Sequence, residues 1–241
     1  MALTDRAALA ALNAELIDCR RCPRLVEWRE RVAREKVARF RDETYWARPV
    51  PGFGDPDARI LLLGLAPAAH GGNRTGRVFT GDASGDFLFA ALHAAGLADR
   101  PASRRADDGL TLFDTYIAAA VRCAPPANKP TIEERDTCAP WLALELGLLA
   151  SIRVIVALGS FGWDAGLRVL AGQGHLVRPK PRFGHGAEVS VGPYWLMGTY
   201  HPSQQNTFTG VLTQPMLQAV LSRARAIADD ADRVAPEPPV S

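Results

Sequence analysis

Two short segments of the chain, residues 60–65 and 154–159, are apolar or glycine at every position and predict strands that are buried on both faces. Residues 116–121 and 195–200 have a similar length and composition and predict two further strands. Continuous apolar runs of this length are typical of parallel strands covered by helices on both sides.

Between and around these runs, apolar residues recur at helical spacing. Helices are expected at about 84–97, 131–150, 160–171 and 213–229, and the second of these opens with Thr131 and Glu134 in the spacing of a capping box. Near the N-terminus, an apolar helix should end at Cys19, and a charged helix should run from Pro23 to about Arg41. Alternating strands and helices predict an α/β fold: a three-layer α/β/α sandwich around a small, mostly parallel four-stranded sheet.

The length of 241 residues, of which 47% are hydrophobic, suits one well-buried α/β domain. We expect this domain to cover residues 1–229, with the N-terminal helices attached to it, and residues 230–241 to form a disordered tail. No apolar run approaches the ~20 residues that span a bilayer. The N-terminus also lacks a basic, then apolar, leader, so we expect a soluble, cytoplasmic protein that binds no membrane.

The charge pattern favours nucleic acid as a partner without requiring it. The formal net charge is only +2, but arginines crowd residues 20–41, and Arg178, Lys180 and Arg182 form a second basic stretch. A single arginine of this kind is ordinarily a solvated surface charge. The concentration of basic residues in two segments is the reason for favouring nucleic-acid binding over that ordinary role.

Four cysteines are the main candidates for a metal site. Two residues lie between Cys19 and Cys22, 100 residues lie between Cys22 and Cys123, and fourteen residues lie between Cys123 and Cys138. Two disulfides would need an oxidising compartment, which nothing at the N-terminus indicates. A zinc site usually has a second tight pair of ligands, whereas a loop of fourteen residues is more open, so the spacing favours a cubane iron–sulfur cluster over zinc.

The loops that follow the four predicted strands are polar and rich in glycine. They are residues 64–82, 122–130, 159–162 and 201–210. In open parallel sheets the binding site lies beyond the carboxyl ends of the strands, so these loops should form it.

Three motifs in these loops, together with the cysteines, resemble the uracil-DNA glycosylase superfamily, and specifically its iron–sulfur-containing type B, or family 5, branch. The motifs are Gly64-Leu-Ala-Pro-Ala, Asn73-Arg-Thr-Gly-Arg-Val-Phe-Thr-Gly-Asp82 and His201-Pro-Ser, and the resemblance covers about residues 15–228. It implies removal of uracil from double- or single-stranded DNA, and a structural 4Fe-4S cluster held by Cys19, Cys22, Cys123 and Cys138. A monomeric, nucleoid-associated repair enzyme is expected.

The resemblance also implies roles at the base-binding site. His201 should donate to uracil O2, Asn128 should match the edge of the base, and Phe79 should stack on it. As alternatives, His201 could cap a turn, Asn128 could be a turn residue and Phe79 a core aromatic. The base-binding residues implied are Gly64, Leu65, Ala66, Pro67, Ala68, Phe79, Asn128 and His201, with Asp82, His201 and Asn128 as the catalytic set.

Two alanines depart from better-known branches of the superfamily. Ala66 stands where other branches have a water-positioning Asp or Asn, so Asp82 becomes the candidate to orient water or stabilise the cationic sugar. The alternative for Asp82 is a helix N-cap. Ala68 stands where a tyrosine elsewhere excludes the thymine methyl, so the pocket should also admit hypoxanthine and xanthine.

DNA contacts are expected from two regions besides the base pocket: the basic stretch at residues 178–182 and the segment after His201. The segment after His201 should enter the minor groove and fill the gap left by the extruded base. The DNA-binding residues expected are Arg74, Arg178, Lys180, Arg182, Ser203, Gln204, Gln205 and Asn206. Two other classes remain open: a lesion-binding protein without turnover, and an iron–sulfur module serving redox chemistry or another DNA transaction such as primer synthesis.

Overall fold

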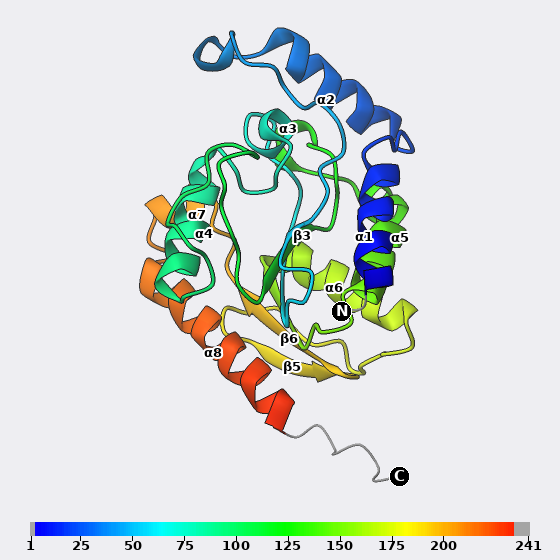
Figure 1. Ribbon diagram of the computed structural model, residues 1–241, viewed down its shortest axis with the longest axis vertical. Helices are drawn as coiled ribbons and strands as arrows, with labels where there is room; N and C mark the ends of the chain where they lie inside the picture. Colours follow the sequence, from blue (N-terminus) through cyan, green and yellow to red (C-terminus); the bar gives the residue numbers. More distant parts are fainter. Residues whose placement is uncertain (1–2, 234–241) are drawn as a thin grey trace.

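The computed structural model describes residues 3–233 (Figure 1). A six-stranded sheet has the order β1-β3-β2-β4-β6-β5. Its four inner strands are parallel, and the two edge strands run antiparallel to their neighbours. The inner strands are β2 (Ile60–Gly64), β3 (Thr115–Ala119), β4 (Val154–Leu158) and β6 (Tyr194–Thr199).

All four predicted strands are therefore confirmed, but the predicted number of strands is wrong. The two additional strands are β1 (Phe53–Gly54) and β5 (Glu188–Val191). β1 has only two residues, and the first three residues of β5 are exposed or half-buried. Neither therefore carries the continuous apolar run that marks a strand buried on both faces.

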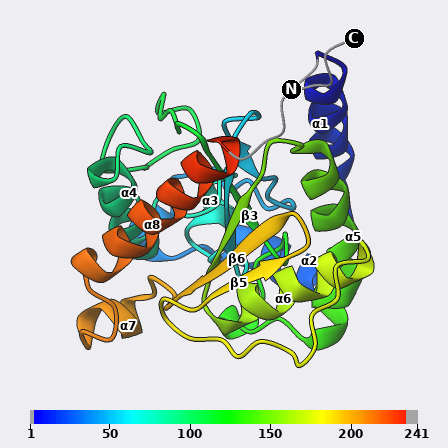
Figure 2. The ribbon, with the colours of Figure 1, turned by 90° about the horizontal axis from the view of Figure 1, so that it is seen from below.

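Helices cover both faces of the sheet, as Figure 2 shows. The side chains of β2 alternate between the two faces: Ile60 and Leu62 pack in one apolar cluster, and Leu61 and Leu63 in the other. The first face is covered by α4 (Ala83–Ala94) and α8 (Gln214–Arg233). The second is covered by α1 (Leu3–Leu16), α5 (Ile132–Leu148) and α6 (Ser160–Gly172). The predicted three-layer sandwich is confirmed.

Two predicted boundaries need correction. The helix α2 (Pro23–Glu35) ends six residues before the predicted Arg41, because Lys36 adopts a left-handed backbone with φ of 50°. Only a short 3-10 turn, Ala38–Phe40, follows it. Helix α8 continues to Arg233, past its predicted end at about residue 229 and into the predicted tail, and residues 234–241 of that tail lie outside the described residues.

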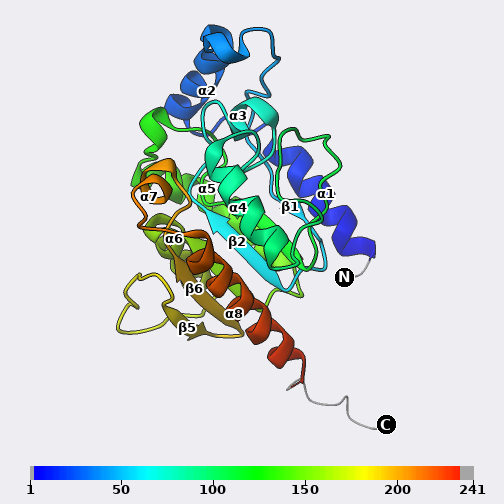
Figure 3. The same cartoon turned by 90° about the vertical axis from the view of Figure 1, so that its left-hand side faces the viewer.

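The helix α2 and the turn after it extend beyond the three layers, above the carboxyl edge of the sheet (Figure 3). The capping box of α5 is confirmed: the Thr131 hydroxyl accepts from the Glu134 main chain, and the Glu134 carboxylate accepts from the main-chain N–H of Thr131. None of the helices between residues 3 and 233 is long and apolar enough to cross a membrane.

Candidate active site and cysteine site

A broad cleft lies at the carboxyl edge of the sheet and brings together loops that are far apart in the sequence. It is lined by residues from the loops after β2, β3 and β6 and by the turn after α2. Seven residues predicted for catalysis, base binding or DNA binding share this cleft: Ala68, Arg74, Asp82, Asn128, Ser203, Gln204 and Gln205.

Phe79 and His201 form a pair at this edge. Their ring centroids are 5.9 Å apart with an interplanar angle of 36°. Phe79 has a left-handed backbone (φ of 53°), and a side chain at Gly64 would come within 2.9 Å of its ring. A non-glycine residue in this conformation is uncommon and is often found at functional sites. The structure thus brings Gly64, at the end of β2, together with Phe79 and His201 from two different loops, and their role in base binding stays a prediction.

His201 is held in a neutral form by burial. Desolvation lowers the pKa of its imidazole from 6.5 to about 4, so the ring is uncharged near pH 7. Gly159 has a positive φ of 96°, and a side chain there would come within 3.2 Å of the His201 Cβ. The main-chain oxygen of His201 accepts a 2.9 Å hydrogen bond from the Asn206 side chain. A neutral imidazole can still donate one N–H hydrogen bond to an oxygen that gains negative charge.

Asp82 both caps a helix and lines the cleft. Its Oδ1 accepts a 2.9 Å hydrogen bond from the Gly85 N–H at the start of α4. Its other carboxylate oxygen lies where a side chain at Gly71 would stand. Burial raises the pKa of Asp82, against the lowering effect of the main-chain N–H groups of Gly85 and Ser84. The N-cap alternative is thus observed, and it leaves a carboxylate oxygen at the cleft.

Ala66 and Ala68 face different surroundings. Ala66 packs against the apolar cluster of Leu25, Val121 and Cys123, whereas Ala68 lines the cleft. A larger residue at position 68 would therefore enter the cleft, and one at position 66 would press on the cluster beside Cys123.

Asn128 lies on the rim of the cleft in the short turn Pro126–Asn128. It is exposed, and both Ala127 and Asn128 have positive φ values, of 52° and 55°. Asparagine tolerates this conformation better than most residues. The turn alternative for Asn128 is thus observed, and the turn places the residue beside the cleft.

Arg74 contributes to the structure of the cleft wall. Its side chain is only 7% exposed, and its guanidinium stacks on Phe40 at 3.9 Å from the ring centroid. Each of its three nitrogens donates within the protein, to the main-chain oxygens of His70 and Gly81 and to the Glu43 carboxylate. The predicted DNA contact of Arg74 is untested, and these bonds assign its guanidinium an internal role.

The second basic stretch does not line the cleft, and the loop that carries it ends beside β6. Arg178, Lys180 and Arg182 are exposed, and Lys180 pairs with Asp164 at 2.7 Å. The same loop continues to His185, whose ring stacks on Tyr200 at 5.2 Å between centroids. Its DNA contacts stay a prediction.

Sequence reasoning missed several residues of the cleft. His70 lines it, and its Nδ1 is hydrogen-bonded to the Tyr45 hydroxyl at 3.0 Å. The outer rim carries Arg39, Arg104 and Arg105. The Arg104–Arg105 pair was a visible signal, but it lies in a long loop without a family motif.

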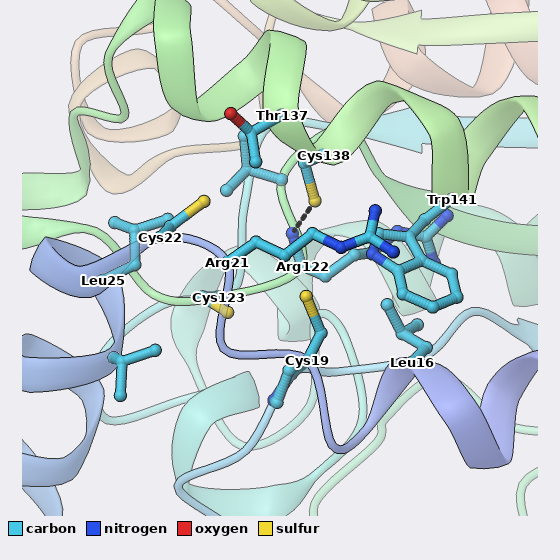
Figure 4. Close-up of a pocket in the computed structure, with 13 residues that line it drawn as sticks. Leu16, Cys19, Arg21, Cys22, Leu25, Arg122, Cys123, Thr137, Cys138 and Trp141 are labelled. Carbon is cyan, nitrogen blue, oxygen red and sulfur yellow. Dashed lines mark hydrogen bonds between the residues drawn. The ribbon is translucent and has the colours of Figure 1, made fainter.

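The four cysteines also come together, around a small pocket away from the cleft. Cys19 and Cys22 lie in the turn between α1 and α2, Cys123 follows β3, and Cys138 lies in α5. All four line one pocket with mostly apolar walls and are free thiols (Figure 4). This grouping is the one predicted from their spacing, and disulfides are excluded in this structure.

The pocket combines buried thiols with hydrogen-bond donors that point at their sulfur atoms. Burial raises the pKa of Cys123 to about 12 and that of Cys138 to about 11. Two N–H donors point at sulfur: Arg29 Nη1 lies 2.9 Å from Cys123 Sγ, and the main-chain N–H of Arg122 lies 3.3 Å from Cys138 Sγ. Among residues 3–233, no group of three or more His, Cys, Asp or Glu side chains is arranged to hold a single metal ion.

The fold and the site define an α/β protein with a cleft at the carboxyl ends of its parallel strands. A family model described as the uracil DNA glycosylase superfamily matches residues 51–225. A type-5 uracil-DNA glycosylase of Mycobacterium tuberculosis is 55% identical over 223 residues, which are 92% of this chain and 82% of that protein. One from Thermus thermophilus is 56% identical over 214 residues, 88% of this chain and 95% of that protein.

A type-5 protein from Pyrobaculum aerophilum is 46% identical over 213 residues, which are 88% of this chain and 90% of that protein. A type-4 protein of the same organism is 31% identical over 187 residues, covering 76% of this chain and 83% of its own length. The chain belongs to the uracil DNA glycosylase superfamily. Its resemblance to the type-5 branch, predicted from the motifs, is confirmed.

Proposed function

We propose that this protein is a DNA base-excision repair glycosylase that removes uracil from DNA by hydrolysing the N-glycosidic bond and leaves an abasic site. The observation that carries the proposal is the Phe79–His201 pair at the carboxyl ends of the parallel strands, in a chain of this superfamily. The aromatic ring offers a surface for stacking the extruded base. The neutral imidazole offers an N–H to the oxygen of the departing base.

The carboxyl end of the sheet supplies groups for both parts of the substrate, the leaving base and the sugar. The leaving base becomes anionic and the sugar cationic, so a glycosylase needs a donor at one end and a carboxylate at the other. His201 suits the first task, and the carboxylate of Asp82, a residue that lines the cleft, suits the second. Asn128 on the rim can match the Watson–Crick edge of uracil with its carbonyl and amide.

The substrate range extends, in our proposal, to deaminated purines. Ala68 lines the cleft with a methyl group where a bulky side chain would narrow it. One steric contact of this kind is worth about 1–3 kcal/mol of discrimination. Hypoxanthine and xanthine should therefore be accepted, and Ala68→Tyr should restrict the enzyme toward uracil.

We also propose that the four cysteines hold a structural 4Fe-4S cluster. Two buried and two half-buried cysteines around one pocket supply the Cys₄ donor set of such a cluster. The wall of the pocket includes Trp141, whose buried Nε1 has no hydrogen-bond partner, and the Nε of Arg29, the residue that bonds Cys123, also lacks one. Buried N–H donors without a partner are suited to a site that binds a negatively charged group.

We infer a cluster at these cysteines rather than a single ion. Thiolates around one zinc, at about 2.3 Å from it, lie only about 3.8 Å apart. No described group of side chains is arranged for a single ion, and a cubane binds each thiolate to a separate iron. Bound there, the cluster would supply no step of the hydrolysis, which transfers no electron. It would fix the turn between α1 and α2 against the body of the protein.

DNA is the proposed partner, bound along the cleft by the arginine-bearing rim and by the basic loop at residues 178–182. A monomer located with the nucleoid in the cytoplasm suits this role. The test is a panel of duplexes and single strands carrying uracil, hypoxanthine or xanthine, with release of the free base as the readout. Excision of uracil and at least one purine supports the proposal. Excision of uracil alone would refute the proposed activity on deaminated purines. Ala68→Tyr is the matched variant with a narrower pocket.

A further inference from the structure

Four arginines are buried among the residues whose side chains the structure describes, and three of them pair with carboxylates. The described residues give Arg74 a partner in Glu43, Arg77 one in Asp108 and Arg122 one in Glu145. A buried charge is retained in a protein only when an opposite charge and hydrogen bonds compensate it. The fourth buried arginine, Arg29, is therefore the exception to be explained.

Arg29 is 2% exposed and forms no ion pair with a carboxylate among residues 3–233. The adjacent carboxylate, Glu30, interacts with the Arg29 charge only at longer range and is bonded to Arg20 instead. Glu134, the other acidic group near the cysteines, pairs with Arg24. The guanidinium instead donates to Cys123 Sγ at 2.9 Å and to the Cys19 main-chain oxygen at 3.2 Å.

The surroundings of Arg29 thus contain cysteine sulfur in the place of a carboxylate. A protonated thiol carries no charge and would leave the guanidinium uncompensated, whereas thiolates that ligate metal carry negative charge. We propose that Arg29 is the buried counter-ion of the cysteine site, which holds the metal centre in place and sets its reduction potential. This inference rests on the proposed cluster.

Arg29 also joins this site to the base-binding loop. Its main-chain oxygen accepts a 3.2 Å hydrogen bond from Asn73, a fully buried residue of the motif that leads to Phe79 and Asp82. The side chain and the main chain of one residue therefore connect the cysteines with the loop that leads to the base-binding residues.

The test compares Arg29→Gln, which removes the charge, with Arg29→Lys, which keeps it. Arg21→Gln is the matched control, because Arg21 lines the same pocket but is exposed and stacks on Trp141. Each protein is purified without oxygen. Three quantities are measured: iron per chain, the rate at which absorbance near 400 nm is lost to an added chelator, and the midpoint potential of one-electron reduction by dithionite.

Arg29→Gln should lose iron about 10- to 100-fold faster than the wild type, the usual effect of removing a group that supports a metal ligand. Its midpoint potential should be lower, because a positive charge and an N–H donor to sulfur both favour the reduced cluster. Arg29→Lys should stay within a few-fold of the wild-type rate. Arg21→Gln removes an exposed charge that water screens, so its effect on both quantities should be clearly smaller than that of Arg29→Gln.

Equal rates and potentials in the wild type and Arg29→Gln would overturn the inference, as would an equal effect of Arg21→Gln. If Arg29→Gln does not fold, Arg29→Lys decides, because loss of iron from a folded Lys variant would show that the charge is not what matters. A wild-type protein without iron would refute the proposed cluster instead, so the two failures are distinguishable.

Discussion

The His201 imidazole lies 5.9 Å from the Phe79 ring, centroid to centroid, although 121 residues separate the two positions in the sequence. Phe79 comes from the loop after β2, and His201 comes from the loop that begins where β6 ends. The sheet places these two loops at one edge because both strands are parallel and flank β4. A stacking surface and a neutral hydrogen-bond donor thereby lie side by side.

Asp82→Asn should separate the two roles of Asp82. Asparagine caps helices about as well as aspartate, so the stability of α4 should be kept while the carboxylate charge is lost. We expect slower single-turnover release of hypoxanthine, with a smaller effect on uracil, which is the better leaving group and needs less help. The measurement is base release by excess enzyme, with the free energy of unfolding in urea as the check on folding.

Asp82→Ala is the matched comparison, since it removes both the cap and the charge and should cost about 0.5–2 kcal/mol of stability. Undiminished release of both bases by Asp82→Asn would show that Asp82 is only a helix cap.

The low pKa of His201 predicts a specific dependence of stability on pH. In the folded protein its pKa is about 4, against a usual value of 6.5. Between these values the unfolded chain binds more protons than the folded one, so the free energy of unfolding should rise with pH. The contribution is complete above about pH 6.5 and is lost as the pH falls towards 4. Urea unfolding of wild type and His201→Gln at several pH values tests this.

The difference between the two proteins isolates His201, because the other titrating groups are shared. A pH dependence that is as steep in His201→Gln as in the wild type would contradict the buried, neutral state of the imidazole.

The salt dependence of DNA binding should locate the DNA track. Replacing Arg178, Lys180 and Arg182 by Gln should lower the slope of log affinity against log salt by about 0.9 for each phosphate that the variant no longer neutralises. The same measurement on Arg104→Gln/Arg105→Gln tests the rim of the cleft. A reduced slope for the rim variant alone would place the DNA backbone along the cleft and away from the basic loop.

The sequence predicts the parts of this fold that bury long apolar runs, and it misses the parts that do not. The inner strands and the main helices follow from periodicity, whereas β1 has two residues and α7 (Gln204–Phe208) has five. Such short elements form because neighbouring parts of the fold hold them. Their own sequence contains too few residues to show a period.

The location of site residues was predictable where they belong to a sequence motif. The role of a residue was not predictable where it depends on the burial of its side chain. A shared place for His201 and Phe79 at one site and the gathering of the cysteines were expected from motif and spacing, whereas the direct contact between the two rings was not. The internal role of Arg74 was not, because an arginine in a loop motif gives no sign that its guanidinium will be 7% exposed. Arg29, by contrast, has a local signal: it lies four residues after Leu25 and three before Val32, on the buried face of α2. The many arginines of this segment obscure that spacing.

The most direct test of the proposed activity is single-turnover release of free uracil from a uracil-containing duplex by wild type and His201→Ala. His175→Ala serves as the control, because His175 packs against Tyr194 away from the cleft. The account predicts free base and an abasic site with the wild type and with His175→Ala. His201→Ala should be about 100-fold slower or more, as when one oxyanion donor is lost, with little change in duplex binding. Tight binding of the duplex by the wild type without any release of free base would contradict the account and identify a lesion-binding protein instead.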